Sequence, residues 1–330
     1  MATIAVTGAT GFVGRYIVRE LVSRNHSVRA LVRSREKARR VLPERSVTLV
    51  QGDISDPGRA EELVQGCNAC INLLGIIREV RGGPGQRPQT FQRIHVDATR
   101  TLVNACQQRG VRRFLQMSAI NASDTGVSEY QRSKFEAEMI VRLSDLDWTI
   151  FRPAIIHGKE SEIVRLAQGW ASGHGAPYFF MPYFTRAVED KRVPLGPVDE
   201  HDPSIAPVLV NDVARAFADA LENPKTIGEV YNLAGEEVLT WPQFLSYMRD
   251  HLPGAHPEQP VWGIPAPVAA RAAAVAKQLG MGRMMPFDEG MALMGAQDAT
   301  ASLEKAREHL NWRPAPFRES FAKYAALVPH

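Results

Sequence analysis

The sequence lacks any long apolar run: nowhere among its 330 residues do roughly 18 apolar residues follow one another, where a membrane-spanning helix needs about 20. The N-terminus also lacks the basic, apolar and small-residue regions that make up a secretory signal. We therefore expect a cytoplasmic protein without a transmembrane segment. Peripheral contact with a membrane stays compatible with this pattern.

Cysteine is scarce, with three residues in the chain. Cys67 and Cys70 form a CxxC, but no second CxxC and no nearby histidine pair completes a zinc or redox site. The nine histidines show no HxH or HExxH spacing, so we expect no metal. Cys70 begins an apolar run that ends at Gly75, which favours a small buried side chain instead.

Strong charge is also missing. The formal net charge is +3, too small for a protein dedicated to nucleic acid, and the acidic residues are spread along the chain. A hydrophobic content of 45% over 330 residues allows one large domain and a smaller one.

What the sequence does have is an alternation of short apolar runs with segments of helical period, typical of βαβ units and a parallel sheet. It predicts strands at 3–6, 27–32, 47–51, 69–74, 113–117, 148–152, 206–210 and 229–233. It predicts helices near 14–24, 58–65, 89–109, 130–144 and 211–223. We therefore expect an α/β fold with a Rossmann-type, doubly wound parallel sheet.

The alternation fades after Pro153, and residues 169–207 are rich in glycine, proline and aromatics, as a lid or substrate loop would be. The predicted domains are a dinucleotide-binding domain over 1–155, to which 205–235 returns, and a smaller, mainly helical substrate or lid domain over 156–204 and 236–330.

A glycine-rich turn follows the first predicted strand and opens the first helix. Gly8, Gly11 and Gly14 have the order and context of a dinucleotide-binding fingerprint, in which glycines allow a tight turn and a close approach of the pyrophosphate. The helix N-terminus offers free N–H groups to the phosphates. The predicted cofactor contacts in this turn are Thr7, Gly8, Thr10, Gly11, Phe12, Val13 and Gly14.

The end of the second strand selects the cofactor, since an acid there binds the ribose 2′-hydroxyl and an arginine accommodates a 2′-phosphate. Arg33 and Ser34 stand there, so NADP(H) is favoured over NAD(H). The alternative is that residues 33–40 are only a solvated basic helix start. Asp53 and Ile54 close the third strand, where an adenine ring would lie.

Tyr130 and Lys134 are four residues apart and share one face of a predicted helix. A lysine beside a tyrosine favours the phenolate, so the phenol can exchange a proton with a carbonyl or alcohol while hydride moves to or from nicotinamide. The pair predicts a catalytic site.

These residues resemble the short-chain dehydrogenase/reductase superfamily in its extended and atypical branch, over nearly the whole chain. Within that branch the chain is similar to NAD-dependent epimerase/dehydratase-like proteins, and most of all to the bacterial relatives of a nucleotide-binding accessory subunit of respiratory complex I. The stretches that carry the resemblance are the glycine turn and residues 52–53, 72–75, 113–122, 130–134, 152–158 and 207–214.

The resemblance implies that Tyr130 is the acid/base and that Lys134 also binds the nicotinamide ribose. It places further cofactor contacts at Leu74, Gly75, Met117, Pro153, Ala154, Ile155 and Ile156. Family members usually carry Ser or Thr where this chain has Ala119, whose side chain has no donor. Ser118, one residue earlier, is the alternative donor, and it completes the predicted catalytic set.

His95 is a second departure, because extended members commonly have asparagine there. It is either a packing residue of its helix or a structural bridge to the catalytic strand. The aromatic run 177–184 either lines a hydrophobic pocket or packs as core. The alanine-rich stretch from Val268 and the methionines beyond it are either core or an apolar surface for a substrate, a partner or a membrane face.

The sequence thus predicts an NADP(H)-dependent oxidoreductase or epimerase-like enzyme acting on a small-molecule substrate, for which a hydrophobic compound is one option. Reduction, dehydration and epimerisation all stay open. The competing hypothesis is a structural, assembly or redox-sensing protein that binds NADP(H) without turnover, as the complex I resemblance and Ala119 suggest. Both monomer and oligomer stay open, although the helices expected at 89–109 and 130–144 often pair between subunits in the superfamily.

Overall fold

The computed structural model describes residues 1–83, 87–189, 198–281 and 285–329. It divides the chain into two compact units, which are described separately. The first contains Met1–Pro153, Val210–Leu233 and Ser302–Arg313, and the second contains Ala154–Leu209, Ala234–Ala301 and Pro314–His330. Residues 302–313, which the sequence reasoning assigns to the smaller domain, belong to the first unit.

The first unit is built on a seven-stranded sheet in which each neighbouring pair is parallel. The strand order across the sheet is β12 (Glu229–Leu233), β6 (Asp147–Pro153), β5 (Arg113–Met117), β4 (Ala69–Asn72), β1 (Thr3–Thr7), β2 (Ser27–Val32) and β3 (Val47–Gln51). The order reverses between β1 and β4, so this is a doubly wound, Rossmann-type sheet, and the predicted fold class is confirmed.

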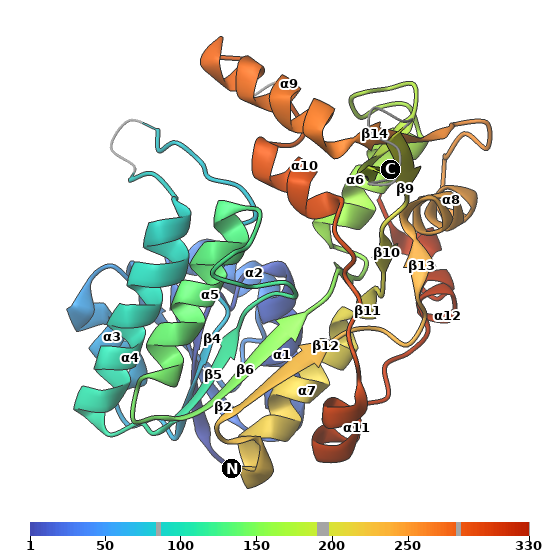
Figure 1. The fold of residues 1–330 in the computed structure, drawn as a ribbon. Helices are drawn as coiled ribbons and strands as arrows, with labels where there is room; N and C mark the ends of the chain where they lie inside the picture. Colours follow the sequence, from blue (N-terminus) through green and yellow to red (C-terminus); the bar gives the residue numbers. More distant parts are fainter. Residues whose placement is uncertain (84–86, 190–197, 282–284, 330) are drawn as a thin grey trace. The chain divides into compact units, whose positions relative to one another are not determined.

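Helices cover both faces of this sheet (Figure 1). They are α1 (Phe12–Ser23), α2 (Arg35–Val41), α3 (Pro57–Val64), a π-helix (Gln92–Asp97) continuing into α4 (Ala98–Arg109), α5 (Glu129–Arg142), α7 (Val210–Glu222), a short 3-10 helix (Pro224–Thr226) and α11 (Glu304–Leu310). α3, α4 and α5 pack over one core cluster with β1, β2 and β3, while α1 packs against α7. Cys70 and Cys106 are fully buried in that cluster, as the apolar run around Cys70 predicts.

The second unit contains short strand pairs and helices. Its strands are β7 (Ile156–His157) with β11 (Val208–Leu209), β10 (Ser204–Ile205) with β13 (Leu239–Thr240), and β14 (Val261–Pro265), β8 (Met181–Glu189) and β9 (Val198–His201) in one sheet. Its helices are α6 (Glu162–Ala171), α8 (Trp241–His251), α9 (Ala266–Gln278), α10 (Glu289–Gly295), α12 (Phe317–Ala322) and a 3-10 turn (Ala325–Leu327).

The core of the second unit is rich in aromatic side chains. Phe244, Phe317 and Phe321 are fully buried between α8 and α12, with Trp170 of α6 beside them. Within the aromatic run Met181 is buried in this core, whereas Phe179 is 80% exposed, and the pocket-lining role stays a prediction. Residues 190–197 of the predicted lid segment lie outside the described residues. Within the described part of the chain, no helix has the length and apolar character needed to cross a membrane.

Candidate functional site

The predicted site residues of the first unit gather at one edge of the sheet. In a parallel sheet all strands end at the same edge, which is where open α/β sheets bind their ligands. β1 ends at Thr7 before the glycine turn, β2 ends at Val32 before Arg33, and β5 ends at Met117 before Ser118. The candidate site is therefore this carboxyl edge.

The glycine turn has no room for side chains at two of its glycines. Gly8 has a φ of +69°, and a Cβ there would lie 2.9 Å from the carbonyl oxygen of Leu73. A Cβ on Gly14 would lie 2.1 Å from the carbonyl oxygen of Gly8. α1 begins directly after Gly11, which makes no side-chain capping bond, so this helix presents its N-terminus without a capping side chain.

The other residues of the turn have different surroundings. Thr7 is fully buried, and its hydroxyl donates to Oδ1 of Asn72 over 2.7 Å, so its side chain serves the sheet. Thr10 is exposed, Val13 is buried in the first turn of α1, and Phe12 packs edge-on against Tyr16. The cofactor contacts predicted for these residues stay predictions.

Arg33 and Asp53 lie close enough to interact electrostatically. Burial raises the pKa of Asp53, but the N–H and hydroxyl of Ser55 and the charges of Arg93 and Arg33 outweigh it and leave the pKa below its usual value. Arg93 contacts both carboxylate oxygens of Asp53 at 3.3 Å. Ser34 accepts from the N–H of Lys37 and so caps α2.

The helix expected from the alternative interpretation of residues 33–40 is therefore present as α2. It begins at Arg35, which leaves Arg33 before the helix, exposed at the end of β2. The helix and the proposed phosphate contact do not exclude each other.

A hollow of about 400 Å³ opens beside Asp53 and Ile54. Its other lining residues come from the segment before the π-helix, from the π-helix and from the start of α4: they include Arg87, Pro88, Arg93, Ile94 and Asp97. An apolar side chain beside carboxylates and guanidinium groups suits a purine ring with exocyclic donors.

Tyr130 and Lys134 stand in the first two turns of α5. Ser128 and Gln131 form a capping box that fixes where this helix begins. Lys134 is only 2% exposed, and its Nζ donates to the carbonyl oxygens of Leu74 at 3.3 Å and of Met117 at 3.4 Å. The structure thus brings Lys134 to two residues predicted at the cofactor.

Gly75 is the third such residue, because a Cβ on it would lie 2.9 Å from Nζ of Lys134. Burial lowers the pKa of Lys134 to about 8, with the charge of Glu138 opposing that shift. Burial raises the pKa of Tyr130 to about 12. The sequence predicts that Lys134 lowers the pKa of Tyr130. In the structure burial raises that pKa instead.

His95 bridges three parts of the site from within the π-helix. Its Nε2 accepts from the N–H of Ile76 at 3.1 Å, so Nδ1 carries the proton and donates to the hydroxyl of Ser133 at 2.9 Å. Its ring also lies edge-on to Tyr130, with centroids 5.5 Å apart. Burial and the charge of Lys134 lower the pKa of His95 to about 2. His95 thus bridges the loop after β4 to α5, and not to the catalytic strand as the sequence predicts.

A buried polar ladder across three strands escaped the sequence reasoning. Asn72 accepts from Thr7 of β1 and donates to Oε1 of Gln116 of β5 at 2.9 Å. Its amide also donates to Thr99, which donates to the carbonyl oxygen of His95. The sequence did contain a signal for it: Asn72 and Gln116 each lie within an apolar strand run. A buried amide needs hydrogen-bond partners, so the two could have been predicted to pair.

Ser118 and Ala119 are both buried, at 3% and 8% exposure. The Ser118 hydroxyl has no hydrogen-bond partner among the described residues. Pro153 ends β6, and Ala154 begins the second unit with Ile155 and Ile156. The roles of these residues stay predictions.

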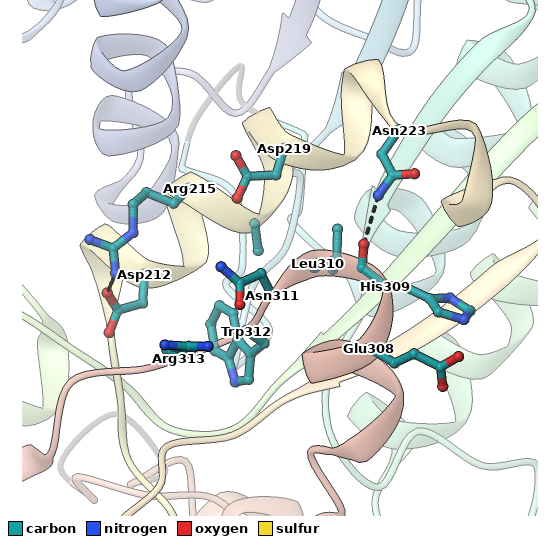
Figure 2. A pocket seen from close by; sticks show the side chains of 11 residues that line it. Asp212, Arg215, Asp219, Asn223, Glu308, His309, Leu310, Asn311, Trp312 and Arg313 are labelled. Atoms are coloured by element: carbon teal, nitrogen blue, oxygen red, sulfur yellow. Dashed lines mark hydrogen bonds and ion pairs between the residues drawn. The ribbon is translucent and has the colours of Figure 1, made fainter.

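A larger hollow of about 580 Å³ lies between α7 and the segment from Glu308 to Arg313 (Figure 2). Asp212 pairs with Arg215, and the Asn223 amide donates to the carbonyl oxygen of His309 at 2.7 Å. Asp219 pairs with Arg24 of α1 at 2.6 Å. These contacts hold α11 and α1 to α7, and none of the predicted site residues lines this hollow.

The residues present fit a nicotinamide dinucleotide. The glycine turn excludes side chains where a pyrophosphate needs backbone contact, and the hollow at Asp53 suits the adenine. Tyr130 and Lys134 stand at the end of the sheet where the nicotinamide would lie. Within the described residues, no group of three His, Cys, Asp or Glu side chains is placed to hold a metal ion.

Comparison with known proteins agrees with this fit. The NAD(P)H-binding family matches residues 8–175. A NADH dehydrogenase [ubiquinone] 1 alpha subcomplex subunit 9 of Dictyostelium discoideum is 29% identical over 74% of this chain and 62% of its own length. A ceramide reductase of Caulobacter vibrioides is 32% identical over 47% of this chain and 46% of its own. The chain therefore spans less than two thirds of these curated relatives.

Solved structures show the same fold over the full chain. The NADPH-dependent quinone oxidoreductase QOR2 of Escherichia coli, solved with NADPH, has a TM-score of 0.67 at 22% identity and covers 97% of this chain and 99% of its own. Structural neighbours also include nucleoside-diphosphate-sugar epimerases. From its glycine turn to its helical Tyr130–Lys134 pair, the chain belongs to the NAD(P)H-binding family, within the extended type of the short-chain dehydrogenase/reductase superfamily.

Proposed function

We propose that the chain is an NADP(H)-dependent reductase that donates a proton from Tyr130 to a carbonyl oxygen of a hydrophobic small-molecule substrate. The observation that carries this proposal is the placement of Lys134, which is buried one helical turn after Tyr130 on α5 and held by the carbonyl oxygens of Leu74 and Met117. A buried ammonium is costly to maintain, and a purely structural nucleotide site would not need one next to a phenol.

The protonation state of the pair favours reduction. With a pKa raised to about 12 by burial, Tyr130 carries its proton at neutral pH and can act as the acid. Lys134, whose pKa burial lowers to about 8, remains largely charged at pH 7 and stabilises the phenolate left after proton transfer. When bound, the reduced nicotinamide supplies the hydride.

His95 and Ser118 have supporting roles in this proposal. His95 fixes the loop at Ile76 and the first turn of α5 through Ser133, and its ring contacts Tyr130. Ser118 holds a buried hydroxyl next to Ala119, where other family members have a donor. We assign it the polarisation of the reacting oxygen, which requires its surroundings to open.

The preference for NADP(H) rests on Arg33. Arg33 is exposed at the end of β2, and its positive charge acts on Asp53. A ribose 2′-phosphate bound near the end of β2 would therefore pair with the Arg33 guanidinium. A hydrophobic substrate is supported by the partial likeness to a ceramide reductase.

The first experiment titrates NADPH and NADH into the wild type, Arg33→Ala and Arg39→Ala. A charge-assisted hydrogen bond contributes about 1.5–3 kcal/mol, so Arg33→Ala weakens NADPH binding about 10- to 100-fold and leaves NADH unchanged. Arg39→Ala removes the same charge from exposed α2 and controls for general electrostatics. Equal loss in both variants, or equal affinity of the wild type for both cofactors, refutes the preference.

The second experiment screens NADPH oxidation with long-chain ketones and aldehydes, then compares Tyr130→Phe with the wild type. General acid catalysis contributes about 10²–10⁴-fold, so kcat falls by at least about 100-fold while the Kd of NADPH stays the same. Unchanged turnover in Tyr130→Phe contradicts the catalytic assignment and leaves the cofactor site standing.

A second function is favoured by one specific observation: relatives that match 70–74% of the chain are accessory subunits of a respiratory complex. Under this alternative the chain binds NADP(H) as a structural, assembly or redox-sensing element and turns nothing over. NADPH binding together with no oxidation across the carbonyl panel supports it.

A further inference from the structure

α9 is apolar on the face that it packs and also on the face that it exposes. Its buried face consists of alanines, namely Ala266, Ala269, Ala270 and Ala273, and it packs on α10. The larger apolar residues point outward: Val268 is 59% exposed, Val275 is 54% exposed, and Leu279 at the C-cap is 69% exposed. An ordinary surface helix has the opposite arrangement.

The exposed apolar residues form one stripe. Spacings of seven and four residues bring Val268, Val275 and Leu279 to the same side of the helix. Figure 1 shows α9 extending past α10, on which it packs. The stripe is therefore an available surface of the second unit.

The charged residues of α9 itself have one sign, whereas α10, on which it packs, begins with Glu289 after its N-cap Asp288. Between Gln259 and Phe287 the sequence contains Arg271, Lys277 and Arg283, and no aspartate or glutamate. Arg271 and Lys277 are exposed on α9, while Arg283 lies outside the described residues. Arg271 is three residues from Val268 and thus flanks the stripe.

Two exposed aromatic side chains lie in or just before the strands that α9 contacts. Trp262 of β14 is 62% exposed, and Phe179, two residues before β8, is 80% exposed. Aromatic and aliphatic side chains beside a helix that carries Lys and Arg are typical of segments that lie in the headgroup region of a bilayer.

We propose that α9 is a membrane-surface helix that inserts Val268, Val275 and Leu279 into an anionic bilayer, with Arg271 on the lipid headgroups beside the stripe and Lys277 adding positive charge from the opposite side of the helix. Charge complementarity selects this occupant. A second copy of the chain would bring the same cations together without acidic partners on the helix, and a like-charged contact opposes association. The proposal does not depend on turnover or on the cofactor preference.

The test is flotation of the protein with vesicles of phosphatidylcholine alone or with 30% phosphatidylglycerol. We expect binding to the anionic vesicles, weakened at least tenfold in 0.5 M salt, and little binding to phosphatidylcholine. Val268→Gln/Val275→Gln/Leu279→Gln and, separately, Arg271→Gln/Lys277→Gln each reduce binding at least tenfold.

The matched control replaces three exposed apolar residues elsewhere, in Leu143→Gln/Val238→Gln/Leu327→Gln, and leaves binding unchanged. Circular dichroism and a thermal midpoint check that each variant folds. Absence of binding to anionic vesicles overturns the proposal, and so does equal loss in the control. A wild-type dimer that the α9 triple variant abolishes, without vesicle binding, assigns the stripe to a second copy instead.

Discussion

Acidification should destabilise the protein through His95 in particular. Its neutral imidazole is 1% exposed, accepts from the Ile76 N–H and donates to Ser133, and these surroundings lower its pKa to about 2. In the unfolded chain a histidine has a pKa of about 6.5. Between about pH 6.5 and pH 2 His95 binds a proton in the unfolded state but stays neutral in the folded state. The free energy of unfolding therefore falls as the pH falls below about 6.5.

The size of the effect follows from the pH interval. Each unit below the unfolded pKa costs about 1.4 kcal/mol, so about 2 kcal/mol is lost by pH 5.0 through this residue alone. His157 in the second unit, whose pKa burial lowers to about 3, adds a similar slope. A comparison between wild type and His95→Asn removes that contribution, because both proteins keep His157.

The assay is urea unfolding of wild type and His95→Asn at pH 7.5, 6.0 and 5.0. At pH 7.5 the variant is the less stable, because the Ile76 N–H and Ser133 lose their partner. Toward pH 5.0 the wild type loses about 2 kcal/mol more than the variant, so the two curves converge. His201→Asn, an exposed histidine in β9, is the control and leaves the pH dependence unchanged. Parallel curves for wild type and His95→Asn would refute the reasoning.

Three further predictions concern the same unit. Gly14→Ala places a Cβ 2.1 Å from the carbonyl oxygen of Gly8, so calorimetric titration should detect no NADPH binding; wild-type affinity would contradict the close-packed turn. Glu138→Gln leaves Arg152, now paired with this fully buried carboxylate at 2.7 Å, without its counter-charge, and urea unfolding should show a loss of about 3–5 kcal/mol; a loss below about 1 kcal/mol would show that the pair is screened. Asn72→Leu removes the centre of the polar ladder and should cost about 1–3 kcal/mol for each polar group left unpaired; a neutral result in the same assay would mean that the ladder adds nothing to stability.

Local pattern predicts most strands of the first unit and the glycine turn, but the strand predicted at 206–210 is wrong in extent: only Val208–Leu209 form a strand, in the second unit, and Val210 begins α7. The predicted ranges 27–32, 47–51, 113–117 and 229–233 coincide with the strands, because each is an apolar run bounded by polar or turn residues. The glycine spacing could be interpreted from the sequence because two of the three positions, Gly8 and Gly14, have no room for a Cβ.

The rest depends on contacts distant in sequence. The helix expected at 89–109 begins as a π-helix, a change of backbone register that no side-chain period announces. The Lys134 ammonium donates to the carbonyl oxygens of Leu74 and Met117, which are 60 and 17 residues away in the sequence. The sequence predicts α2 only as the alternative interpretation of residues 33–40. Ala38 is its one buried residue, so the segment has no apolar helical period to detect.

In the π-helix the number of residues matters as much as their identity, because it sets the direction in which the following side chains point. Each wider turn accommodates one residue more than an α-helical turn, and one residue corresponds to about 100° of rotation. Phe91 and His95 reach Tyr130 from one side of this bulge, while Thr99 beyond it reaches Asn72 in the sheet. Deleting Val96 or Asp97 would change the rotation between His95 and Thr99 by about 100° while both side chains remained in the sequence. Alignment gaps at this segment therefore separate homologues that share the residues from those that share the geometry.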